Sequence, residues 1–89
     1  MTYEVRVSRQ AAAYFYRLLD RRTQRAVLRR LAQIATTPDG VATRPIANAE
    51  GRRTALVGGW RLIFSINDPG RRVNVSVIRP RAALYATGP

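Results

Sequence analysis

The sequence contains no cysteine and no histidine, and all sixteen of its basic residues are arginines. Without cysteine there are neither disulfides nor thiolate metal sites, a composition that the reducing cytoplasm allows. Without histidine the chain lacks the commonest metal ligand and the commonest general acid–base group. The five acidic residues are scattered along the chain, so no carboxylate pair or two-metal site is indicated, which disfavours a metal-dependent nuclease. We therefore expect no metal and no cofactor.

Long hydrophobic runs are also missing. No apolar stretch approaches the roughly 20 residues of a membrane span, and the N-terminus lacks a signal-peptide pattern. The 89 residues, of which 46% are hydrophobic, are enough for a thin core. We predict a single domain over residues 1–89, a cytoplasmic location and no membrane partner.

Positive charge is what the sequence has in excess, with a formal net charge of +11. The use of arginine without lysine can reflect codon bias alone. The net charge itself predicts attraction to phosphate backbones or to an acidic protein, with an affinity that falls as salt rises.

The first half of the chain has the pattern of one strand followed by two helices. Residues 3–8 alternate between apolar and polar side chains, as a half-buried strand does. Helical spacing follows over Arg9–Leu19 and again over Arg21–Ala35, with Ser8 and Asp20 as expected N-caps. The side chains expected to face the core are Tyr3, Val5, Val7, Ala12, Phe15, Leu18, Leu19, Val27, Leu28, Leu31, Ile34 and Ala35.

The second helix also carries a stripe of arginines opposite its apolar face, formed by Arg22, Arg25 and Arg29. Two interpretations remain open for this stripe: a solvated face, or a contact with nucleic acid or an acidic partner. Pro38 ends the helix. Residues 39–51 are rich in small, Gly, Pro and Asn residues and predict a connecting loop.

Three runs rich in β-branched and aromatic residues occupy the stretch from Arg52 to Ile78. Turn sequences separate them, Gly58-Gly59 and Asp68-Pro69-Gly70, so an antiparallel meander is predicted. In the middle run the more apolar set should pack on the helices, which leaves Arg61 pointing outward. That set is Trp60, Leu62, Phe64 and Ile66.

In the last run, alternation places Val73, Val75 and Val77 on one face and Asn74, Ser76 and Ile78 on the other. Pro80 cannot continue the hydrogen-bonded ladder, so the chain should bend there. The predicted fold class is α+β: a β-α-α-β-β-β order in which a helical hairpin packs on one face of an antiparallel sheet.

This order resembles the RelE/ParE superfamily of small toxins from bacterial toxin–antitoxin pairs. The motif that carries the resemblance is Gly59-Trp60-Arg61-Leu62-Ile63-Phe64-Ser65-Ile66, which is similar to that family's Gly-Tyr-Arg third strand. A Val-rich strand and a basic segment that ends in Tyr85 follow it. The resemblance covers essentially the whole chain and leans to the RelE-like branch.

The resemblance implies a set of site residues. Arg61 would be a phosphate-binding arginine, Arg79 and Arg81 a basic pair, and Tyr85 the tyrosine beside the scissile nucleotide. Family members also carry basic residues on the second strand of the meander. Arg52 falls on one such position with Arg53 next to it, so both are expected to bind RNA phosphate; the other position is Thr54.

The implied function is that of a toxin that cleaves messenger RNA on the ribosome and is silenced by an antitoxin with an acidic toxin-binding segment. Ribosome, mRNA and antitoxin are therefore the expected partners. Two alternatives remain: a gyrase-binding toxin of the ParE-like branch, and a degenerate member that only binds its antitoxin.

The chemistry that these residues suit is metal-independent attack of the RNA's own 2′-OH on the adjacent phosphate. Arginine binds phosphate oxygens bidentately and stays charged, but it is a poor proton-transfer group. Nearby arginines should lower the pKa of Tyr85, which would then act as a base or orient one. The plain alternatives are an Arg61 paired with a surface carboxylate and a Tyr85 that anchors the tail. For Arg71 and Arg72, next to a turn, the plain alternative is a solubilising edge.

Overall fold

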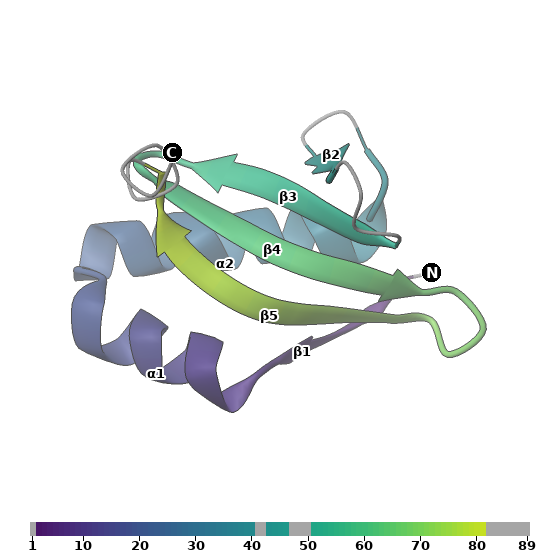
Figure 1. Cartoon of the computed structure of the whole chain (residues 1–89), viewed down its shortest axis with the longest axis horizontal. Helices are drawn as coiled ribbons and strands as arrows, with labels where there is room; N and C mark the ends of the chain where they lie inside the picture. The colour runs from purple at the N-terminus through teal and green to yellow at the C-terminus, as the bar shows by residue number, and fades with distance from the viewer. Residues whose placement is uncertain (1, 41–42, 47–50, 82–89) are drawn as a thin grey trace, which may run out of the picture.

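Two helices lie against one face of a five-stranded sheet (Figure 1). The computed structural model describes residues 2–40, 43–46 and 51–81. In chain order the elements are β1 (Glu4–Val7), α1 (Arg9–Leu18), α2 (Arg21–Thr36), β2 (Thr43–Pro45), β3 (Arg52–Val57), β4 (Trp60–Asn67) and β5 (Arg72–Pro80). The predicted α+β class is confirmed. Of these helices, neither is long and apolar enough to cross a membrane.

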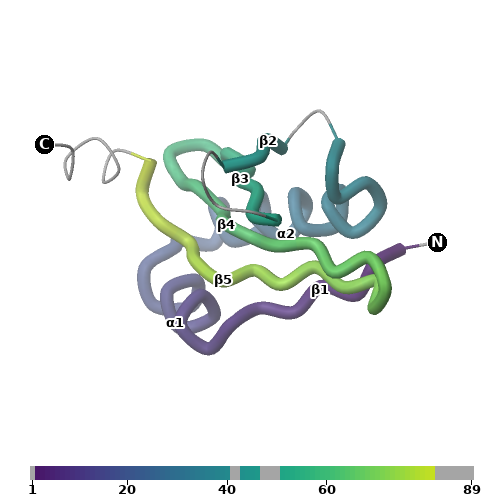
Figure 2. The backbone as a smooth tube through the Cα atoms, turned by 45° about the vertical axis from the view of Figure 1, so that its right-hand side comes forward, coloured from purple at the N-terminus to yellow at the C-terminus, as the bar shows by residue number. Residues whose placement is uncertain are grey.

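The sheet is mixed, with the strand order β1-β5-β4-β3-β2. The predicted meander of β3, β4 and β5 is antiparallel. The prediction of a wholly antiparallel sheet was wrong, because β1 runs parallel to β5, with Val5 beside Val73. Figures 1 and 2 both show these two strands side by side, although they come from opposite halves of the chain. Alternation within each strand could not reveal this pairing, since direction depends on how the helices return the chain.

A short strand, β2, lies inside the segment predicted to be only a loop. It pairs antiparallel with β3 and places Arg44 opposite Thr54. Its three residues are too few to show an alternating pattern, and Pro45 argues against a strand in sequence. Pro45 is tolerated because β2 is the edge strand, where one row of backbone N–H groups has no ladder partner.

The helices begin at the predicted caps. The hydroxyl Oγ of Ser8 accepts from the backbone N–H of Ala11 at 3.0 Å, and a carboxylate oxygen of Asp20 accepts from the N–H of Thr23 at 2.8 Å. Each bond satisfies one of the N–H groups that a helix start leaves without an intrahelical partner. Both helices therefore start where the sequence indicates.

The core lies between the helices and the sheet. Leu62 and Phe64 on β4 are fully buried, as predicted, and they pack with Val27 and Ile34 of α2. The Trp60 ring contacts Tyr14 of α1 edge to face at 5.6 Å. Burial of side chains of this size is worth about 1.5–3 kcal/mol each, so this layer is the main stabilising term.

Three residues predicted to face the core are instead exposed: Val7 by 41%, Leu18 by 59% and Leu28 by 55%. Val7 ends an edge strand, so it has a neighbouring strand on one side only. Leu18 is the last residue of α1, and the next residue, Leu19, takes the buried position in an extended conformation. Leu28 lies on the flank of the α2 apolar face rather than at its centre.

Candidate nucleic-acid interface

Arg61 and Arg79 lie side by side on the sheet face that points away from the helices. The β4–β5 register places them directly opposite each other. Their neighbours in the same strands, Leu62 and Ile78, are buried on the helix side, so both arginines project from the outer face. Arg61 is half-buried and Arg79 is exposed. Arg61, predicted to point outward, therefore does so, and it has a second arginine as its neighbour.

A β-bulge brings Arg79 to this face. The register shifts between Ile63, which pairs with Val77, and Phe64, which pairs with Val75, so Ser76 is an extra residue in β5. The prediction that Ile78 lies on the face opposite to Val73 and Val75 was wrong: Ile78 is 3% exposed and is buried on the helix side with them. A side chain alternates with a period of two, so one extra residue reverses every face after it. Unbroken alternation would have sent Arg79 toward the helices.

The bulge is held by two serines. Oγ of Ser76 donates to the carbonyl of Ile63 at 3.2 Å. Oγ of Ser8 donates to the carbonyl of Ser76 at 2.8 Å, and the backbone N–H of Ser8 donates to the carbonyl of Val75 at 2.8 Å. Because Ser8 Oγ also caps α1, the helix start and one of the bonds that hold the bulge come from the same side chain.

Arg81 follows the end of β5, next to the turn between β3 and β4. Its backbone N–H donates to the carbonyl of Gly59 at 2.8 Å, and its side chain is exposed. In this turn Gly58 has a φ of 57°, which glycine adopts without strain. Arg81 is thus tethered one residue beyond the Trp60–Pro80 pair that ends the ladder. The predicted site residue Tyr85 lies outside the described residues.

Arg52 shares the outer face, but it is at the other end of β3. Arg52 pairs with Ser65 of β4, whereas Arg61 pairs with Leu56 of β3. Arg52 and Leu56 are four residues apart along β3. At about 3.3 Å per residue, this separates Arg52 from Arg61 by roughly 13 Å. Arg44 is exposed on the edge strand β2 opposite Thr54, so it lies on the same face, but it is on the far side of β3 from Arg61. Sequence reasoning missed Arg44, because its strand is too short to show a face.

Arg53 does not join this group. It pairs with the buried Phe64 and thus lies on the helix side of the sheet. Its Nε donates to Oγ1 of Thr43 at 3.0 Å, and an Nη donates to the carbonyl of Thr43 at 3.2 Å. Thr43 is itself buried. These bonds hold β2 on β3, so the described contacts of Arg53 are structural.

Two polar atoms on the outer face are buried and have no hydrogen-bond partner among the described residues: Nε of Arg61 and Oγ1 of Thr54. They belong to adjacent strands, since Thr54 pairs with Ile63 and Leu56 with Arg61. An unpaired buried polar atom costs about 1–3 kcal/mol. An anion that accepts from Arg61 would remove part of this cost.

One carboxylate, that of Glu4, pairs with two arginines at the β1 edge of the sheet. Oε1 of Glu4 on β1 accepts from Nε of Arg6 at 3.1 Å and from Nε of Arg72 at 3.2 Å. These two arginines lower the pKa of Glu4, Arg6 first. Within the described residues no comparable ion pair involves Arg61 or Arg79. Among the described residues, the guanidinium groups of Arg61 and Arg79 are therefore not paired with a carboxylate.

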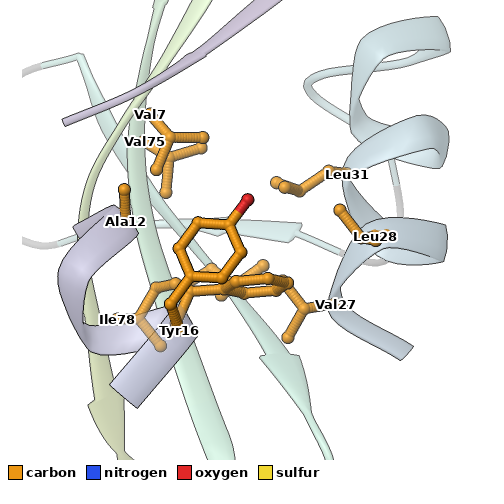
Figure 3. Close-up of a pocket in the computed structure, with 10 residues that line it drawn as sticks. Val7, Ala12, Tyr16, Val27, Leu28, Leu31, Val75 and Ile78 are labelled. Carbon is orange, nitrogen blue, oxygen red and sulfur yellow. The ribbon is translucent and has the colours of Figure 1, made fainter. Parts of the chain in front are cut away.

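The described residues contain no group of three or more His, Cys, Asp or Glu side chains that could hold a metal ion. An apolar hollow lies elsewhere, between α1, α2 and the sheet (Figure 3). It has a volume of about 110 Å³, and its lining includes Phe15, Tyr16, Leu28 and Leu31. No charged side chain lines it. On the outer face, Arg61 and Arg79 present guanidinium groups, a type of group that binds phosphate oxygens.

No protein-family model matches the sequence, and no curated protein matches it significantly in sequence. Solved structures do match. A chain of the toxin–antitoxin complex RelBE2 from Mycobacterium tuberculosis superposes with a TM-score of 0.80 at 23% identity, covering 91% of this chain and 100% of its own. A chain of the archaeal RelE–RelB complex from Pyrococcus horikoshii gives 0.78 at 20% identity, covering 91% and 97%.

A third match is the free toxin RelE of E. coli, solved as a mutant in which two arginines separated by one residue are replaced by alanine. It superposes with a TM-score of 0.79 at 17% identity, covering 97% of this chain and 93% of its own. The chain therefore has a RelE/ParE-like toxin fold, as the Gly59–Ile66 motif predicted.

Proposed function

We propose that this protein is the toxin of a type II toxin–antitoxin pair and that it cleaves messenger RNA on the ribosome in the cytoplasm. The observation that carries the proposal is the pair Arg61 and Arg79, directly opposite each other on an outward sheet face. Two adjacent guanidinium groups without a carboxylate between them form a site for a phosphate. The RelE-like fold supports the same assignment.

In the proposed reaction the 2′-oxygen of a ribose attacks the adjacent phosphorus. The bond from phosphorus to the 5′-oxygen of the next nucleotide breaks, which leaves a 2′,3′-cyclic phosphate and a 5′-hydroxyl. One proton leaves the 2′-OH and one reaches the 5′-oxygen, so charge and atoms balance. Arg61 and Arg79 stabilise the negative charge that grows on the phosphate oxygens, and Arg81 binds a neighbouring phosphate.

Arg79 and Arg81 have the separation of the two arginines that the E. coli RelE mutant lacks. This agreement supports their role as a basic pair. Tyr85 is proposed as the group that accepts or orients the 2′-OH proton. Arginine cannot do so, because its pKa exceeds about 12. With neither histidine nor lysine in the chain, catalysis depends on the ribosome to hold the RNA in line.

The proposed inhibitor is an antitoxin with an acidic toxin-binding segment. The structures of similar fold include toxin–antitoxin complexes. A chain with a net charge of +11 gives an acidic segment a strong electrostatic attraction, and the outer face carries four arginines for it to contact, Arg44, Arg52, Arg61 and Arg79. Such a segment would cover the phosphate site and silence it.

The test is cleavage of a defined message on purified bacterial ribosomes, with cut sites read by primer extension. The wild type should cut within codons only when ribosomes are present. The variants Arg61→Gln and Arg79→Gln should lose cleavage. Arg17→Gln, an exposed arginine on α1, removes the same charge elsewhere and should cleave normally.

Three outcomes would contradict the proposal. Intact messages together with inhibition of DNA supercoiling by purified gyrase would make the protein a gyrase-binding toxin. If the protein neither cleaves messages, nor inhibits gyrase, nor arrests growth, it would be a toxin homologue that only binds its antitoxin. Equal activity of Arg61→Gln and Arg17→Gln would remove the arginine pair from the mechanism.

A further inference from the structure

The molecule carries a second concentration of positive charge, on the side of α2 that faces away from the sheet. We name Arg21, Arg22, Arg25 and Arg29 the α2 stripe; all four side chains are exposed. Val27 and Ile34, on the opposite side of the helix, are buried in the core. Helix α2 lies against one face of the sheet (Figure 1). Arg61 and Arg79 project from the other face, so the stripe and the arginine pair point in different directions.

The spacing of the stripe places its charges in one row. Arg21, Arg25 and Arg29 follow one another at intervals of four residues, and Arg22 is three residues before Arg25. Residues three or four apart are neighbours on a helix surface. The row from Arg21 to Arg29 is roughly 12 Å long at 1.5 Å per residue, a length that spans several phosphates of one nucleic-acid strand.

This arrangement opposes the stability of the helix. Neither α1 nor α2 contains an acidic residue. Like charges at these intervals repel each other, and Arg21 and Arg22 stand in the first turn, where the helix dipole disfavours cations. The N-cap Asp20 offsets this only at the start of α2. Four arginines kept in such a row are therefore better explained by an external anion than by the folding of the helix.

We propose that the α2 stripe binds the phosphate backbone of base-paired RNA, and so forms a second contact with RNA in addition to the Arg61–Arg79 pair. The identity of this RNA rests on the proposed function: if the protein acts on the ribosome, the base-paired RNA is ribosomal RNA. The side of a helix is convex and the stripe contains no aromatic ring, so it has no platform on which the bases of a single strand could stack. Guanidinium groups in a row suit the backbone of a duplex, which needs no base contact.

An acidic protein is the competing partner for the stripe. Stable protein interfaces bury an apolar centre surrounded by polar residues. The stripe has no large apolar residue within it; the exposed Leu28 lies on the flank, toward the apolar hollow with Tyr16 (Figure 3). A partner that uses only the stripe would have no such centre, so the observations favour RNA.

The test compares two double variants with the same loss of charge. Arg25→Gln with Arg29→Gln removes the middle of the stripe, and Arg9→Gln with Arg17→Gln removes two exposed arginines of α1. Binding to purified small ribosomal subunits and to an RNA duplex is measured against salt. Loss of two phosphate contacts should weaken binding roughly tenfold or more at physiological salt and lower the salt slope by about 2. The α1 variant should bind within about twofold of the wild type.

Cleavage on ribosomes separates this proposal from the proposed function. The stripe variant should need a higher ribosome concentration and reach the same maximal rate, whereas Arg61→Gln should lose maximal rate. If no variant cleaves RNA, binding to the duplex still decides the role of the stripe. Equal weakening by both double variants would overturn the proposal, as would unchanged RNA binding with loss of binding to poly-glutamate. The melting temperature should be unchanged or raised in the stripe variant.

Discussion

Arg61 on β4 and Arg79 on β5 are direct cross-strand neighbours on the outer face of the sheet. Like charges directly opposite each other destabilise a sheet, by about 0.2–1 kcal/mol on the scale of cross-strand pairs. In addition, Nε of Arg61 is buried without a hydrogen-bond partner among the described residues. A pair that lowers stability in this way is typical of a binding site that is completed by its ligand.

Substitution of Arg61 should change stability and activity in opposite directions. Replacing Arg61 by Gln removes the repulsion from Arg79, so the free energy of unfolding should rise, by up to about 1 kcal/mol. Cleavage on the ribosome should fall about 10²–10³-fold, the usual loss when one preorganised donor to a developing charge is removed. Thermal melts and single-turnover cleavage measure the two effects. A variant that loses both stability and activity would show that Arg61 is structural.

The bulge at Ser76 predicts a large difference between substitution and deletion. Ser76→Ala loses the hydrogen bond to Ile63 and should cost about 0.5–1.5 kcal/mol. Deletion of Ser76 restores alternation and turns Ile78 outward, which should lower the free energy of unfolding by about 1.5–3 kcal/mol. It also turns the charged Arg79 toward the core, which adds a further cost. Urea unfolding followed by circular dichroism measures both. If the deletion were as stable as Ser76→Ala, β5 would tolerate either register and the bulge would not fix Arg79.

Arg52 and Arg53 are adjacent in sequence but should behave in opposite ways. Arg53→Gln breaks the bonds to the buried Thr43 and should lower the free energy of unfolding by about 1.5–3 kcal/mol. Arg52→Gln changes an exposed side chain, so stability should stay within about 0.5 kcal/mol. For the Arg52→Gln variant, the slope of the logarithm of the RNA-binding constant against the logarithm of salt concentration should become shallower by about 1. Denaturation and filter binding on the two variants decide this; the reverse pattern would contradict the assignment of the two faces.

Stability should fall in acid because two carboxylates are held in their charged form. The pKa of Glu4 is lowered by its hydrogen bonds to Arg6 and then Arg72, and the pKa of Asp20 by its hydrogen bonds to Thr23. When the folded-state pKa is below the unfolded value, the unfolded chain binds protons first as pH falls. The contribution is therefore complete above the ordinary values of 4.5 for Glu4 and 3.8 for Asp20, and it is lost as pH falls through the lowered folded values.

Melting temperatures between neutral pH and pH 2 test this. Glu4→Gln and Asp20→Asn remove the two titrations, and Asn still serves as an N-cap. Each variant should show a shallower loss of stability in acid than the wild type. An unchanged acid profile in the double variant would contradict the assignment of acid sensitivity to Glu4 and Asp20.

Local pattern determined much of this protein. The two helix caps, the helices that follow them and the burial of Leu62 and Phe64 follow from spacing and side-chain chemistry, and the structure has them as expected. The outward direction of Arg61 follows from the same parity, because both neighbours in its strand are apolar. The excess of arginine over acidic residues, in a chain without histidine or cysteine, by itself indicates an anionic partner.

Only the tertiary structure decided which arginines lie together. The direction of β1, the existence of β2 and the extra residue at Ser76 depend on pairing between distant segments, which leaves no periodic signal within any one of them. That bulge reverses the alternation and sends Arg79 to the side of Arg61. The presence of β2 gives Arg53, on the helix side, its partner Thr43. The sequence supplied the charges, and long-range strand pairing assigned each of them to a face.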